Sequence, residues 1–266
     1  MLRRPRLDPS AKFAFQIVLI ASLLGTPVLA ADNSALSLYV AGKYQEAEDA
    51  GLAQADAAGL ALAARSALAA EMMRAAPCLD CLKRAEDEAR RAIALDPKMP
   101  DGHIYLSLAL GYEARIQGLI AARLDEYPEQ AKSNLDAALA ADPGNCWALA
   151  ALGGWNIEIV RGGGTTLARW LYGASVAEGL ADFAKAFAAA PDNLVLRYQY
   201  ALSLGGFDAQ TYRDRIEDSL TRAVAAKPAT AYEVFAQGRA RELLDALKVN
   251  DAKNFARLVR RDQGYP

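Results

Sequence analysis

The chain has 266 residues, and 53% of them are hydrophobic, which is enough apolar material for a large core. Four basic residues and one acidic residue lie in residues 1–30, so residues 31–266 keep 26 basic and 31 acidic side chains, a net charge of −5. That part holds no cluster of Lys and Arg that would follow a phosphate backbone, which excludes nucleic acid as an expected partner.

Residues 1–30 have the pattern of a secretory signal peptide. The basic lead before the apolar core consists of Arg3, Arg4, Arg6 and Lys12. Val28 and Ala30 are modest or small residues that suit signal peptidase, so we expect cleavage after Ala30. The apolar core, residues 13–24, is shorter than the roughly 20 residues that span a bilayer, which disfavours an uncleaved membrane anchor. No later apolar run is long enough either, so we expect no membrane insertion after cleavage.

Four alanine-rich segments run into a proline in nearly the same way. They end at Pro97, Pro143, Pro191 and Pro228. Five residues before each proline stand Ala92, Ala138, Ala186 and Ala223, and twelve before it stand Ala85, Ala131, Gly179 and Ile216. Small residues at fixed places let two helices approach closely. Recurrence on this scale predicts a solenoid of helix pairs.

This code of small and large residues before a proline resembles the tetratricopeptide repeat (TPR) family. Residues 42–47, Gly-Lys-Tyr-Gln-Glu-Ala, match the turn and second-helix entry of that motif, and the likeness covers about residues 32–240. The resemblance implies an all-α, right-handed superhelix of antiparallel helix pairs. We expect repeats over residues 31–248 and a capping helix with a tail over residues 249–266. More narrowly, the chain resembles exported TPR proteins of Gram-negative bacteria, which implies a periplasmic location.

Two repeats are longer than a TPR unit of about 34 residues. The repeated pattern of residues at the helix ends keeps the same spacing on both sides of each proline. The extra residues must therefore lie between the paired helices, at about residues 115–126 and 161–175. We expect both to be loops along one edge of the array, where inserted segments often bind partners. Residues 161–166, Arg-Gly-Gly-Gly-Thr-Thr, lack the lysine of a phosphate-binding loop, so we expect a flexible turn capped by Thr165.

Few residues offer catalytic or metal chemistry. The pair Cys78 and Cys81 either exchanges thiols at a helix N-terminus or forms a local disulfide, and the absence of a thioredoxin-like setting favours the disulfide. Zinc needs about four ligands, and the chain has three cysteines and one histidine, so we predict no metal site. His103 stands at a core position of the repeat, and Cys146 is expected to be a small buried residue. We predict no cofactor and no enzymatic activity.

The first helix of each TPR unit lines the inner face of the superhelix, and the repeat phase assigns residues to that face. The predicted partner-binding groove contains Tyr112, Arg115, Trp147, Glu158, Arg161, Tyr198, Tyr232 and Arg239. Tyrosine, tryptophan and arginine are the residues enriched at binding hot spots. The alternative is that several of these aromatic residues only fill the core between neighbouring helices.

Three functional hypotheses follow. The first is a non-catalytic periplasmic scaffold or adaptor that binds a peptide or a protein of the cell envelope in its concave groove. The second is a small-molecule carrier or enzyme whose ligand is enclosed by the insertions at residues 115–126 and 161–175. The third is thiol–disulfide exchange at Cys78 and Cys81.

Overall fold

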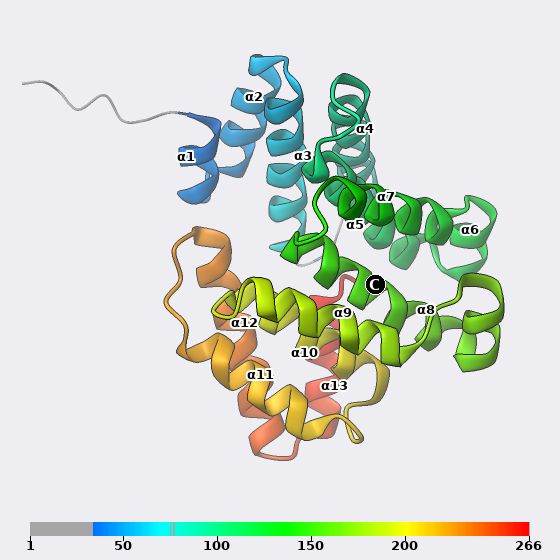
Figure 1. The fold of residues 1–266 in the computed structure, drawn as a ribbon. Helices are drawn as coiled ribbons and strands as arrows, with labels where there is room; N and C mark the ends of the chain where they lie inside the picture. The colour runs from blue at the N-terminus through cyan, green and yellow to red at the C-terminus, as the bar shows by residue number, and fades with distance from the viewer. Residues whose placement is uncertain (1–33, 75, 77, 266) are drawn as a thin grey trace, which may run out of the picture. The chain divides into compact units, whose positions relative to one another are not determined.

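The computed structural model describes residues 34–74, 76 and 78–265, and every regular element in this part is an α-helix (Figure 1). In chain order the helices are α1 (Ala35–Val40), α2 (Tyr44–Gln54), α3 (Ala57–Met72), α4 (Leu79–Leu95), α5 (Pro100–Gln117), α6 (Leu119–Leu124), α7 (Tyr127–Ala141), α8 (Cys146–Tyr172), α9 (Val176–Ala189), α10 (Leu194–Asp208), α11 (Arg213–Ala225), α12 (Ala231–Lys248) and α13 (Ala252–Asp262). None of these helices is long and apolar enough to cross a bilayer. The predicted signal peptide, residues 1–30, lies outside the described residues.

Successive helices pack as hairpins, and successive hairpins stack on one another. The pairs are α1 with α2, α3 with α4, α5 with α7, α8 with α9, α10 with α11, and α12 with α13, while α3, α5, α8, α10 and α12 also contact the neighbouring first helices. The predicted all-α solenoid of helix pairs is therefore confirmed. The first and last hairpins also touch, because α1 contacts α12 and Tyr232 packs against the cluster formed by Tyr39 and Tyr44.

The helix ends follow from the residues around the repeated prolines. α4 and α7 end at Leu95 and Ala141, just before Pro97 and Pro143, because a proline has no N–H to continue the helix. Two of the first helices, α8 after α7 and α10 after α9, begin where the side chains of Asn145 and Asn193 accept hydrogen bonds from the free backbone N–H groups of the first turn.

Glycines permit the closest helix contact in the array. A Cβ atom on Gly179 of α9 would lie 2.8 Å from the carbonyl oxygen of Gly153 in α8, and one on Gly153 would lie 2.7 Å from the Phe183 ring. α2 and α3 meet in the same way at Gly51 and Gly59. Gly179 stands twelve residues before Pro191, where the equivalent repeats have Ala85 and Ala131.

The two insertions are helical, so the prediction of loops was wrong. In residues 115–126, α5 continues to Gln117 and α6 follows directly after Gly118. In residues 161–175, α8 continues to Tyr172 and is broken only at Gly164, which has φ 73° and ψ 161°. The predicted flexible turn is reduced to this kink at Gly164, because Ala168 and Tyr172 pack against Val160 in a small core on either side of it.

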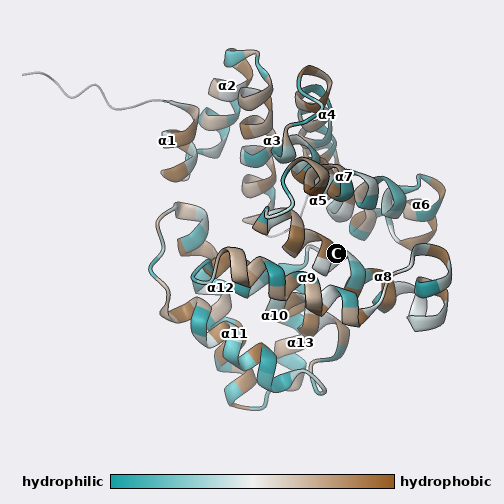
Figure 2. Ribbon diagram, in the orientation of Figure 1, coloured by the Kyte–Doolittle hydropathy of each residue, from teal (hydrophilic) through white to brown (hydrophobic). Residues whose placement is uncertain are grey.

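α13 packs across the first helices of the last two hairpins. Phe255, Leu258 and Val259 form its buried face, and Phe255 and Val259 lie against the backbone of α10 at Gly205. Hydrophilic residues alternate with hydrophobic ones along α13, as the hydropathy colouring shows (Figure 2). The helix therefore covers apolar surface that an array of repeats leaves at its end.

We predict that Gly179→Ala destabilises the protein by about 1–3 kcal/mol, because the new methyl group overlaps the Gly153 carbonyl and the Ile157 side chain. Gly238→Ala on α12 is the matched control, since a Cβ atom there meets nothing within 4 Å. The control should gain about 0.4–1 kcal/mol. Urea unfolding of both variants measures the difference, and equal stabilities would contradict the close packing of α8 on α9.

Candidate functional site

A cavity of about 810 Å³ lies on the face formed by the first helices. Its lining comes mainly from α3, α5, α8 and α10, with three residues each from α6 and α7, two from α12, and one each from α1 and α9. Apolar and aromatic side chains predominate, among them Leu68, Met72, Leu108, Trp155, Ile159 and Leu171. The first helices therefore supply most of the cavity lining, and the second helices α7 and α9 add to it.

Six of the eight predicted groove residues line this cavity. They are Tyr112, Arg115, Trp147, Glu158, Arg161 and Tyr232. Trp147 keeps 38% of its surface exposed, so its ring is accessible to a bound molecule. Burial raises the pKa of Tyr112, and the positive charge of Arg115 opposes that shift.

Tyr198 and Arg239 are not part of the cavity lining. The repeat phase predicts that both side chains point toward the inner face. However, α13 and the residues after it lie over that part of the face. Tyr198 is 3% exposed and belongs to the main core, and burial together with nearby Asp262 raises its pKa well above the ordinary value. Arg239 has its guanidinium 3.7 Å from Glu242 and 3.8 Å from Asp262.

A cluster of opposite charges connects α5 and α8 at the cavity wall. Arg161 donates two hydrogen bonds to the Glu158 carboxylate, at 2.5 and 3.1 Å. Arg115 reaches the same carboxylate from α5, with Nε 3.9 Å from Oε1, too far for a hydrogen bond. One carboxylate therefore faces two guanidinium groups. Tyr265, from the segment after α13, also contacts this cluster and lines the cavity.

Among the lining residues that sequence reasoning missed are Arg65 and Tyr265. Arg65 points from α3 over the ring of Tyr39, with its guanidinium carbon 4.2 Å from the ring centroid. Arg65 is the only charged residue in the alanine-rich run from residue 57 to residue 70. A single charge in such a run could have indicated a functional residue. Tyr265 lies outside the repeats, so the repeat phase had no means of placing it.

The two insertions border the cavity. Leu119 and Arg123 come from the first insertion, and Leu167 and Tyr172 come from the second. The Arg123 guanidinium lies 5.6 Å from the Tyr172 ring, which joins the insertions to each other. Several large apolar side chains of the same segments are exposed, namely Leu119, Ile120, Leu124, Leu167, Trp170 and Leu171.

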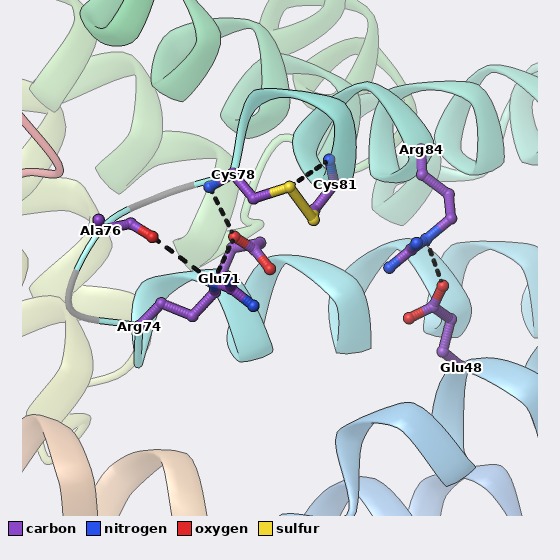
Figure 3. Close-up of a disulfide and its surroundings, with 7 residues drawn as sticks. All are labelled: Glu48, Glu71, Arg74, Ala76, Cys78, Cys81 and Arg84. Carbon is purple, nitrogen blue, oxygen red and sulfur yellow. Dashed lines mark hydrogen bonds and ion pairs between the residues drawn. A yellow bond between two sulfur atoms is a disulfide. The ribbon is translucent and has the colours of Figure 1, made fainter.

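Cys78 and Cys81 form a disulfide at the start of α4 (Figure 3). The Cys78 N–H donates to the Glu71 carboxylate at 2.9 Å, and the Cys81 N–H donates to the Cys78 sulfur at 3.2 Å. Glu71 and the two cysteines are the one group of possible metal ligands found in the described residues, and the disulfide occupies both sulfurs. A thiolate, which exchange chemistry needs, would be repelled by the Glu71 carboxylate.

His103 is a core histidine, as predicted. It is 8% exposed, with Nδ1 2.8 Å from the Asn134 side-chain oxygen and Nε2 3.0 Å from the Pro97 carbonyl oxygen. Both ring nitrogens are therefore occupied by structural contacts. Cys146 is half-buried at the start of α8, where burial raises the pKa of its thiol.

Two pairs of neighbouring carboxyl groups lie away from the cavity, and three of these four residues, Glu48, Glu88 and Glu113, are buried. Burial and the neighbouring Glu48 carboxyl raise the pKa of Glu88 to about 8. Burial and Glu86 raise the pKa of Glu113 to about 7. None of these four residues lines the cavity, so the raised pKa values bear on stability rather than on a bound substrate.

We predict that the free energy of unfolding decreases as the pH rises from about 4.5 to about 8, because folded Glu88 holds a proton that the unfolded chain releases. Glu88→Gln should remove most of the decrease in stability above pH 7. Glu113→Gln should reduce the decrease in stability only below about pH 7. Each proton contributes up to about 1.4 kcal/mol per pH unit. Urea titrations from pH 5 to 9 measure this, and a flat profile in the unsubstituted protein would contradict it.

Comparison with known proteins identifies the fold. No protein-family model matches the chain. No curated protein matches it either. Among solved structures, the chain is similar to a thermophilic TPR protein from Thermus thermophilus, with 20% sequence identity and a TM-score of 0.54 over 78% of this chain and 95% of the other. The similarity, together with the stacked helix hairpins, shows that the chain has an all-α fold of the TPR type.

Proposed function

We propose that the protein is a non-catalytic scaffold that binds an extended segment of a protein partner in the cavity lined by its first helices. The cavity carries this proposal. Its lining includes the aromatic rings of Trp147, which is 38% exposed, and of Tyr232, together with the guanidinium groups of Arg65 and Arg115, and such residues contribute most energy at protein interfaces. TPR arrays offer such concave surfaces to extended or helical peptides.

We further propose that the protein acts in the periplasm and that its partner belongs to the cell envelope. The signal-peptide pattern of residues 1–30 supports export. The disulfide between Cys78 and Cys81 supports an oxidising compartment, since disulfides persist mainly outside the cytosol.

A small-molecule carrier is a second candidate, favoured by the position of the insertions. Both border the cavity, and its volume of about 810 Å³ lies within the usual range of ligand pockets, roughly 300–1,000 Å³. Native mass spectrometry of the gently purified protein distinguishes the candidates. A reproducible bound mass that is lost in Arg65→Ala supports a carrier, and a mass equal to the polypeptide alone contradicts it.

We predict that a photoreactive residue at Trp147 crosslinks to one partner protein in intact cells. Leu167, which lines the cavity from α8 and is 48% exposed, should give the same adduct. Val234 on α12 is the matched control, because it is apolar and 58% exposed but lies outside the cavity lining. Mass spectrometry identifies the adducts. Identical adducts at Val234, or none at Trp147 and Leu167, would contradict binding in the cavity.

A further inference from the structure

The segment that follows α13 returns to the face of the first helices. Gly264 has φ 75°, a conformation that ends the helix, and the N–H groups of Gly264 and Tyr265 donate to the last carbonyls of α13. Gln263 is 6% exposed and donates from its side chain to the Leu202 carbonyl oxygen at 3.0 Å. These contacts direct Tyr265 toward the cavity.

The Tyr265 side chain is held by charged groups. The guanidinium carbon of Arg161 lies 4.6 Å from the ring centroid, and those of Arg260 and Arg115 lie 5.5 and 5.8 Å away. The phenol donates a hydrogen bond to Glu158 and accepts one from Arg161. Cation–π contacts and charge-assisted hydrogen bonds are specific for an aromatic ring that carries a hydroxyl group.

This contact is local and separable from the fold. α13 is fixed by the buried side chains of Phe255, Leu258 and Val259, whereas Tyr265 is held by its ring, by its hydroxyl group and by one backbone hydrogen bond to the Arg260 carbonyl oxygen. Arg115 adds only a long hydrogen bond, 3.4 Å, to the Gln263 carbonyl oxygen. The side chains of Arg115, Glu158 and Arg161 remain 22%, 28% and 30% exposed, so they are reachable from the cavity. Tyr265 can therefore leave without unfolding α13.

We propose that Arg115, Glu158 and Arg161 form a subsite for a tyrosine side chain on an extended segment of the partner, and that Tyr265 occupies it in the free protein as an intramolecular competitor. The inference rests on the proposed function and specifies the partner's chemistry. The ring fits the face of Arg161, and the hydroxyl satisfies Glu158, so tyrosine is preferred to phenylalanine. A tethered competitor reaches millimolar effective concentration and weakens binding without any change in the subsite.

The test uses the full chain and a fluorescein-labelled peptide, Arg-Asp-Gln-Gly-Tyr-Pro, which copies residues 261–266. By fluorescence anisotropy, Tyr265→Ala should bind this peptide about tenfold or more tightly than the unsubstituted protein, because the competitor is gone. A peptide with phenylalanine for tyrosine should bind roughly tenfold more weakly than the original. Adding Arg161→Ala to Tyr265→Ala should abolish measurable binding.

Two further variants keep the outcome decisive. Tyr265→Phe preserves the ring and its packing, and it should bind the peptide with intermediate affinity even if Tyr265→Ala folds poorly. Lys253→Ala, on the exposed side of α13, should match the unsubstituted protein. If the unsubstituted protein, Tyr265→Phe and Tyr265→Ala all bound the peptide with equal affinity, Tyr265 would not be a competitor. If a peptide with alanine in place of tyrosine bound as tightly as the original peptide, the proposed tyrosine subsite would be wrong. Crosslinking at Trp147 is independent of both outcomes, so it would show whether the cavity still binds a partner.

Discussion

The close approach of paired helices at small residues is the constraint on which the structure depends. Where Gly153 faces Gly179, the two backbones are so close that a single methyl group cannot be inserted. In two other repeats the position equivalent to Gly179 holds an alanine, Ala85 or Ala131, and both are buried. Each hairpin then repeats nearly the same geometry, and the first helices of successive hairpins come to share one face. The cavity is a consequence of that repetition.

The fold was largely predictable because its information is local and repeated. The prolines fixed the helix ends, and the small residues before them fixed the packing phase. Tyr112 and Trp147 were placed on the inner face by the repeat phase together with the resemblance to TPR arrays, and both line the cavity. The departures come from contacts between distant parts of the chain. Tyr198 follows the same phase, but α13 covers it, and no pattern within the repeats encodes that contact.

The insertions show a second limit of sequence reasoning. The glycines at residues 162–164 are typical of a turn, yet only Gly164 leaves the helical conformation. Packing of Ala168 against Val160 outweighs the low helix propensity of glycine. Charged residues show the same limit: Glu88 of α4 is 2% exposed and lies next to Glu48 of α2, a contact between distant residues that no repeat pattern indicates.

The central claim is that α13 covers the late first helices and leaves the earlier ones open around the cavity. Hydroxyl-radical footprinting of the folded protein, followed by mass spectrometry, tests it at single residues. We expect rapid oxidation of Trp147, which is 38% exposed, and strong protection of Tyr198, which is 3% exposed. Oxidation of Tyr198 at a rate close to that of Trp147 would contradict the account, because it would mean that the inner face is open along its whole length.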